Sequence, residues 1–362
     1  MRAYNFAAGP STLPLEVLQE AQNELLDFQN TGMSVTEISH RNKKYMAVVE
    51  EAEANLRKLL NISEDYAVLF VQGGASQQFA AVPLNLMHNG KADYVVTGNF
   101  SQKAYEEGVI YGGENAKCVA SSKDKNFTYI PDVDKIQFNA DADYVHICSN
   151  NTIFGTRYAK FPETGNVPLV ADMSSEILSR EIDVNKFGVI YAGAQKNVAP
   201  AGVTIVIAKR SLIQNPLSIC PTMLKWKVQD KEGAHSLYNT PPCFSIYVAN
   251  LVMRRLLKLG GIKAINEVNE YKAGLLYDFI DNSKLFKNYV QKEYRSIMNV
   301  PFVTGDEEMD AKFVKEATAA GLVSLKGHRL VGGMRASIYN AMPVEGVQAL
   351  VEFMKKFEEE NC

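Results

Sequence analysis

Two residues at the ends of apolar stretches could do chemistry together: Lys196, just beyond Val189–Tyr191, and Asp172, directly after Leu169–Ala171. A lysine that condenses with an aldehyde must be partly neutral. Free lysine has a pKa of about 10.4, so such a lysine needs a site enclosed by the protein, where burial lowers its pKa. A protonated pyridine ring, in turn, needs a carboxylate partner. The pair therefore indicates pyridoxal 5'-phosphate (PLP), with Lys196 as the attachment point and Asp172 as the pyridinium partner.

Each residue also has an ordinary interpretation. A lysine after a strand is usually a solvated loop residue, and strongly perturbed lysines are the exception. Asp172 could be the N-cap of a helix. The PLP hypothesis therefore depends on whether further pieces of such a site occur elsewhere in the chain.

A glycine-rich turn with Ala75 and Ser76 follows the apolar stretch 67–71 and precedes a helix-like segment. Backbone N–H groups at a helix N-terminus, together with a serine hydroxyl, can hold a phosphate. The alternative is a plain glycine turn with Ser76 as the N-cap. The turn is not a nucleotide-binding P-loop, because no Gly-Lys-Ser/Thr follows.

Phe100 and Thr152 each follow a further apolar stretch. A flat phenylalanine ring could stack on a cofactor ring, and the threonine hydroxyl could bind the cofactor's phenolic oxygen. Taken in isolation, Phe100 is more often a core phenylalanine, and the alternative for Thr152 is an ordinary turn threonine.

Basic residues occur at three separate places in the sequence. They are His40 with Arg41, His328 with Arg329, and Arg335. Each alone is more often a surface residue. Together they could bind a substrate with several negative charges, since the guanidinium group matches carboxylate and phosphate geometry.

These residues need a scaffold that brings them together. Near-continuous apolar stretches predict strands that are buried on both faces, hence a mostly parallel sheet with helices on either side. In such sheets ligands bind at the carboxyl ends of the strands, where the polar residues above are found. The predicted strands are 67–71, 94–96, 144–148, 168–171, 189–192 and 203–208.

Helix-like apolar spacing surrounds this region, and the first 15 or so residues are too rich in breaks for regular structure. A smaller α+β domain is predicted after a boundary near residue 260. The predicted helices are 15–29, 43–60, 243–259, 262–282, 309–320 and 344–359, with a strand near 294–304.

The bulk properties are those of an ordinary globular protein of 362 residues, with 46% apolar and 22% charged residues. A net charge of −3 gives no electrostatic case for binding nucleic acid or an anionic membrane. Five scattered cysteines favour a reducing compartment, and no Cys/His spacing predicts a metal site. Without a signal peptide or a long apolar segment, a cytoplasmic location is expected.

Taken together, the chain resembles the phosphoserine aminotransferases, fold-type I PLP enzymes of the class V group. The resemblance implies an α/β fold: a large PLP-binding domain (16–260) with a mostly parallel seven-stranded sheet flanked by helices, and a small α+β domain (1–15 and 261–362). It rests on segments spread over the whole chain: 5–10, 37–41, 72–77, 149–153, 171–175, 194–197, 238–242 and 332–340.

The resemblance also implies roles by position. Lys196 and Asp172 act on the cofactor as above, Phe100 replaces a tryptophan of many relatives as the stacking ring, and Thr152 binds the phenolic oxygen. Residues implied to hold the cofactor phosphate are Ala75, Ser76 and Gln195, with Asn239 and Thr240 from the neighbouring subunit of a homodimer. Residues implied to bind substrate are Arg335 for the α-carboxylate and His40, Arg41, His328 and Arg329 for the distal anion. Ser76 departs from some relatives, which have an arginine there.

The implied reaction is reversible amino transfer between L-glutamate and 3-phosphohydroxypyruvate, giving 2-oxoglutarate and O-phospho-L-serine, a step of serine biosynthesis. Use of a related substrate of pyridoxine biosynthesis stays open. Two alternatives are another class V enzyme and a PLP-binding protein without activity. A cysteine desulfurase needs a mobile cysteine in the small domain, where only Cys362 is present. A mere binding protein needs no carboxylate clamp.

Overall fold

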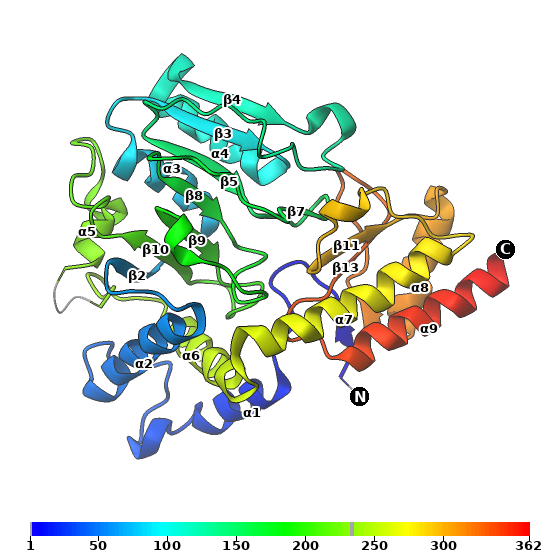
Figure 1. Cartoon of the computed structure of the whole chain (residues 1–362). Coiled ribbons are helices and arrows are strands. Elements are labelled where there is room, and N and C mark those ends of the chain that lie inside the picture. Colours follow the sequence, from blue (N-terminus) through cyan, green and yellow to red (C-terminus); the bar gives the residue numbers. More distant parts are fainter. Residues whose placement is uncertain (1, 232–234) are drawn as a thin grey trace.

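A twisted seven-stranded sheet forms the centre of the computed structural model, which describes residues 2–231 and 235–362 (Figure 1). The strand order is β2-β10-β9-β8-β5-β3-β4, and β10 alone runs antiparallel to its two neighbours. The predicted mostly parallel sheet is therefore confirmed. The strands are β2 (Tyr66–Val71), β3 (Ala92–Val96), β4 (Ala116–Ser121), β5 (Tyr144–Cys148), β8 (Leu169–Asp172), β9 (Val189–Gly193) and β10 (Thr204–Lys209).

Both faces of this sheet are buried, which explains the near-continuous apolar stretches in its strands. Successive side chains of a strand point to opposite faces. In β2, Val68 and Phe70 accordingly belong to one apolar cluster, whereas Ala67 and Leu69 belong to another.

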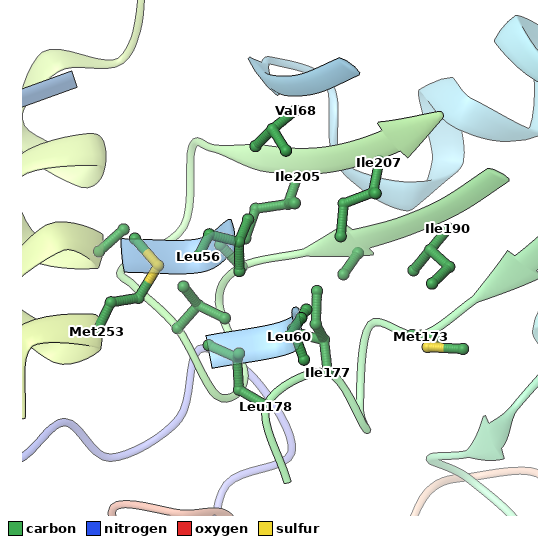
Figure 2. Close-up of a cluster of buried hydrophobic side chains, with 14 of the residues drawn as sticks. Leu56, Leu60, Val68, Met173, Ile177, Leu178, Ile190, Ile205, Ile207 and Met253 are labelled. Carbon is green, nitrogen blue, oxygen red and sulfur yellow. The ribbon is translucent and has the colours of Figure 1, made fainter. Parts of the chain in front are cut away.

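Helices cover each face. On one side, α2 (Lys43–Leu60) and α6 (Cys243–Lys258) contribute to the first cluster. On the other side lie α3 (Gly74–Leu86) and α4 (Asn99–Gly112). Figure 2 shows the first cluster, where side chains of α2 and α6 meet those of the strands; the labelled residues are Leu56, Leu60, Val68, Met173, Ile177, Leu178, Ile190, Ile205, Ile207 and Met253.

A separate apolar cluster lies in the C-terminal part of the chain. Its members come mainly from α7 (Gly261–Asn282), α9 (Val344–Asn361) and the antiparallel pair β11 (Asn299–Phe302) and β13 (Met334–Ser337). Phe6 from the N-terminal segment is also part of it. This grouping supports a second domain, whose exact bounds stay a prediction.

The remaining elements are short or peripheral. They are α1 (Leu15–Glu24), α5 (Trp226–Gln229), α8 (Glu307–Ala319), β1 (Tyr4–Asn5), β6 (Asn150–Asn151), β7 (Thr156–Arg157) and β12 (Leu322–Val323). Among the described residues, no helix combines the length and the apolar composition that a bilayer crossing requires.

Several local predictions were wrong. The first 15 residues do contain regular structure, because β1 pairs with β12 far along the chain. The first helix ends at Glu24, not 29, and Gln29 and Asn30 adopt positive φ. The edge strand β4 was missed because it has one neighbour and exposes Lys117, so its sequence lacks an apolar run. The β13 strand was missed because it is only four residues long.

Candidate active site

The sheet topology brings five sequence-separated positions to one edge. Strands β2, β3, β5, β8 and β9 run in the same direction, so their carboxyl ends share that edge. The residues at these ends are Ala75 and Ser76 in the first turn of α3, Phe100 in the first turn of α4, Thr152 after β5, Asp172 as the last residue of β8, and Gln195 with Lys196 after β9.

Lys196 lies on the connection between the antiparallel strands β9 and β10, not at a strand-to-helix turn. The connection is fastened at its base by the Ala194 N–H, which donates to the Val203 carbonyl at 3.1 Å. The N-terminal segment covers it from outside, since the Ser11 N–H donates to the Gln195 carbonyl at 3.0 Å and the Ser11 hydroxyl donates to the Lys196 carbonyl. Sequence analysis gave Ser11 no role, and only its distant folded neighbours reveal this contact.

The Lys196 amine is buried between an aromatic ring and a hydroxyl. Its Nζ donates to Thr152 Oγ1 at 2.7 Å and lies 5.4 Å from the centre of the Phe100 ring. Burial lowers the pKa of Lys196, the Arg335 charge lowers it further, and the Asp172 carboxylate opposes both. The site thus favours the neutral, nucleophilic amine relative to a free lysine.

Asp172 is buried and held by one residue, Ser174. Both the Ser174 N–H, at 2.9 Å, and its hydroxyl, at 2.6 Å, donate to Asp172 Oδ1. Burial raises the pKa of Asp172, while the Lys196 charge and the Ser174 hydrogen bonds lower it. The sequence placed Ser174 beside Asp172 but did not show that it binds the carboxylate.

Arg335 reaches the Lys196 site from the C-terminal part of the chain, which has its own apolar cluster. Located on β13, it donates from Nη1 to the Thr152 carbonyl at 3.2 Å. Its Nε is buried and has no hydrogen-bond partner among the described residues. Burial lowers the pKa of Arg335, although a guanidinium stays charged at neutral pH. A buried, unpaired N–H donor on a cation is suited to bind an anionic ligand.

Two of the remaining basic residues lie near Arg335. The pKa of His328 is lowered by partial burial and then by the charges of Arg335, Arg329 and Lys103, so these groups form a cationic neighbourhood. Lys103, on α4, is a member that sequence analysis missed, because a single lysine in a helix carries no signal of its own.

His40 and Arg41 are not brought to this centre within one chain. In the part of the chain that the structure describes, no hydrogen bond or ion pair links their side chains with Lys196, Thr152 or Arg335. The His40 Nε2 atom is buried and finds no partner among those residues.

The proposed phosphate-binding residues lie at the start of α3 and on a nearby turn. Gly73 is the N-cap of α3, with φ 90°, a conformation that suits glycine, so the alternative with Ser76 as the N-cap is wrong. Ser76 is exposed, and the turn with Asn239 and Thr240 lies close by, since Gln72 Nε2 donates to the Thr240 carbonyl at 3.4 Å.

A cavity of about 580 Å³ is lined by sequence neighbours of two site residues. It is lined by Asn99, the residue before Phe100, and by Phe154, two residues beyond Thr152. Its lining also includes Tyr289 and Leu330 from the C-terminal part of the chain. Both parts of the molecule therefore line this cavity, whose lining residues do not include Lys196, Asp172 or Arg335.

The donor set fits PLP. A buried amine with a lowered pKa suits an aldehyde, the Phe100 face suits an aromatic ring, and a buried carboxylate suits a protonated ring nitrogen. The free backbone N–H groups at the start of α3 suit a phosphate.

Comparison with known proteins identifies the family. The model of the class-V aminotransferases matches residues 3–350. A phosphoserine aminotransferase of Bacillus cereus is 55% identical over 361 residues, which is 99% of each chain, and one of Desulfosudis oleivorans is 52% identical over 362 residues. The chain belongs to the phosphoserine aminotransferase family. The solved phosphoserine aminotransferase from Bacillus circulans subsp. alkalophilus, 47% identical, superposes with a TM-score of 0.97 over 100% of this chain and 99% of that one.

A PLP-bound phosphoserine aminotransferase from Trichomonas vaginalis, 41% identical, has a TM-score of 0.92 over 98% of this chain and 100% of that one. An aspartate aminotransferase from Thermus thermophilus is only 17% identical and shares the fold alone, with a TM-score of 0.79. The predictions of a PLP-dependent phosphoserine aminotransferase and of its fold class are thus confirmed. The roles of single residues stay proposals.

Proposed function

We propose that this phosphoserine aminotransferase transfers the amino group reversibly between L-glutamate and 3-phosphohydroxypyruvate, with the residues above in the roles that follow. The observation that carries the proposal is the convergence on Thr152, which accepts Lys196 Nζ at 2.7 Å through its hydroxyl and Arg335 Nη1 at 3.2 Å through its carbonyl. A nucleophilic amine and a carboxylate-binding cation thus flank one residue.

Lys196 attaches the cofactor and later moves a proton. PLP, when bound, supplies an electron sink for the pair released from the substrate Cα. Lys196 would hold PLP covalently, and once free its amine would take the substrate Cα proton as a general base. Its lowered pKa keeps a larger neutral fraction available for both tasks.

Asp172 keeps the ring nitrogen protonated, and Phe100 supports the ring. A buried carboxylate beside a cationic nitrogen is stabilised by the charge pair, which offsets the burial that raises its own pKa. The Thr152 hydroxyl accepts a hydrogen bond from Lys196 Nζ, so it is suited to hold the phenolic oxygen next to that lysine.

Arg335 binds the α-carboxylate that every amino acid substrate carries. Its Nη1 is oriented by Thr152, whereas its buried Nε lacks a partner among the described residues. A bound carboxylate would satisfy that donor with a charge-assisted hydrogen bond.

The distal phosphate or γ-carboxylate is bound by His328 and Arg329, with His40 and Arg41. The first two belong to the cationic neighbourhood around Arg335. The second two lie apart from it within one chain, so we propose that they act from the neighbouring subunit. With Ser76 in place of an arginine, these four residues matter more.

The proposed active form is a homodimer in which Asn239 and Thr240 complete the phosphate site of the neighbouring subunit. Tyr238, next to this turn, is 50% exposed, and an exposed tyrosine is typical of an interface. The contact between Gln72 and Thr240 within one chain supports an alternative, in which the turn binds the cofactor phosphate of its own subunit. A cytoplasmic location is also proposed, in keeping with five cysteines that are all free.

The decisive experiment follows the cofactor absorbance of purified holoenzyme after adding a single amino donor. Glutamate and O-phospho-L-serine should each convert the bound cofactor to its amino form, and 3-phosphohydroxypyruvate should reverse the change. A protein that only binds PLP would show no conversion. Faster conversion by alanine than by phosphoserine would favour another class V transaminase.

A further inference from the structure

Ser174 binds Asp172 in a way that the residue roles above do not use. Its backbone N–H and its hydroxyl both donate to the same carboxylate oxygen, Oδ1, at 2.9 and 2.6 Å. The hydroxyl bond is at the short end for an O–H donor to a carboxylate, which is typical of a charge-assisted bond. Both bonds end on one oxygen and leave Oδ2 for a cationic partner.

The same hydroxyl ties this carboxylate to the strand that leads to Lys196. The Gly193 N–H donates to Ser174 Oγ at 3.0 Å. Gly193 ends β9 and stands three residues before Lys196, while Asp172 ends the neighbouring parallel strand β8. One hydroxyl therefore acts as donor to Asp172 and as acceptor from β9, so its single proton has a fixed direction.

Three titratable groups lie around Asp172, and one of them, Lys196, affects its charge. Lys196 favours the ionised carboxylate, whereas Cys148 on β5 and Tyr191 on β9 pair with Asp172 in the strand register and supply no positive charge. Burial raises the pKa of Cys148 and of Tyr191, so both stay neutral. Ser174 is the hydrogen-bond donor that the structure records on this carboxylate, whether Lys196 is charged or neutral.

We propose that Ser174 is a positioning residue, which fixes the Asp172 carboxylate in its orientation and keeps it ionised opposite the cofactor ring nitrogen. The inference rests on the proposed role of Asp172 and extends it to a residue that touches neither substrate nor cofactor. The Ser174 hydroxyl binds Asp172 and the Gly193 N–H, and neither partner is assigned to the substrate, so its loss should affect the cofactor more than the binding of amino acids.

The test compares three variants of the holoenzyme. Ser174→Ala removes the hydroxyl, Ser174→Thr keeps it, and Ser179→Ala is the matched control. Ser179 is a fully buried serine whose hydroxyl has no hydrogen-bond partner among the described residues. Thermal unfolding of each apoprotein checks that the variants fold alike.

Ser174→Ala should bind PLP more weakly, shift the pH titration of the bound cofactor's absorbance, and slow single-turnover conversion by glutamate. The loss of one charge-assisted bond predicts a decrease of about 10- to 100-fold in that rate. The KM for glutamate should stay within about twofold, since Arg335 is untouched. Ser174→Thr should recover most of the rate, and Ser179→Ala should match the wild type.

The inference is overturned if folded Ser174→Ala keeps the wild-type absorbance titration and PLP affinity, or if Ser179→Ala changes them equally. It also fails if Ser174→Thr folds but is as impaired as Ser174→Ala. A wild-type holoenzyme that glutamate and phosphoserine do not convert would instead contradict the proposed function, because PLP affinity and the absorbance titration report on Ser174 without any substrate.

Discussion

Lys196 and Arg335 are joined through one residue, Thr152. The two lie 139 positions apart in the chain, and each is near a different apolar cluster. Lys196 Nζ donates to the threonine hydroxyl at 2.7 Å, and Arg335 Nη1 donates to its carbonyl at 3.2 Å. A substrate whose carboxylate binds Arg335, as proposed, would therefore be held with its Cα near the lysine amine. Proximity of this kind contributes strongly to rate, provided that the geometry is maintained.

Lys196 should be the only residue that carries PLP covalently. Borohydride reduction of the holoenzyme, followed by peptide mapping, should place the pyridoxyl label on this lysine alone. Lys272 provides an internal control, because it is also fully buried and burial lowers its pKa to about 7. Its Nζ, however, donates to three backbone carbonyls, those of Ile338, Tyr339 and Met342, so we expect it not to react with PLP. A label on Lys272 would contradict the assignment of Lys196.

Asp172→Asn should retain PLP but lose most turnover. The amide keeps the size of the side chain, yet it cannot stabilise a protonated ring nitrogen as an anion does. A carboxylate–pyridinium contact in a dry site stabilises the transition state by several kcal/mol, so its loss should slow the reaction at least about 100-fold. Single-turnover rates with glutamate measure this, and a rate near that of the wild type would show that the role is wrong.

Reconstitution of the apoprotein with PLP should depend on pH through Lys196. The neutral amine is the nucleophile, so the rate rises with pH and levels off above the pKa of Lys196. Burial and the Arg335 charge lower that pKa, and the opposing Asp172 charge is smaller than the burial effect. The midpoint of the rate profile should thus lie below 10.5, the ordinary value. Stopped-flow absorbance measures it, and a midpoint at or above 10.5 would contradict the lowered pKa.

Hybrid dimers can decide which subunit the Asn239 turn serves. One subunit carries Lys196→Ala and the other carries Asn239→Ala with Thr240→Val. If the turn acts across the interface, one site of each hybrid has a complete set of residues and works at the wild-type rate per site. If the turn acts within its own subunit, as the Gln72 contact would allow, every site carries a defect and the hybrid stays impaired.

The distal-anion residues should distinguish substrates by charge. Arg41→Ala and Arg329→Ala should each reduce kcat/KM for phosphoserine and glutamate, because a lost charge-assisted bond costs about 1.5–3 kcal/mol. Alanine has no distal anion and should be nearly unaffected. Arg335→Ala is the matched comparison, since it should weaken all three alike. Equal losses for all three substrates in Arg41→Ala would show that Arg41 does not bind the distal anion.

Much of this protein was determined by sequence alone, for identifiable physical reasons. Apolar runs of strand length predicted the parallel strands because burial on both faces leaves no polar alternation. Polar residues directly after the strands predicted which edge of the sheet holds the site, since parallel strands place their carboxyl ends together. Lys196 and Asp172 were recognisable because a buried amine and a buried carboxylate each require a special partner.

Contacts between distant segments were decided by the tertiary structure. The short strand that carries Arg335 pairs with β11 and forms a further bridge with Lys326, and the edge strand β4 pairs with β3. Ser174 has an unremarkable place in the sequence. Its link from Asp172 to Gly193 exists because β8 and β9 pair in one register, in which Asp172 lies opposite Tyr191, two residues before Gly193. A hydrogen bond requires two atoms within about 3 Å, and only the packed chain brings such atoms together.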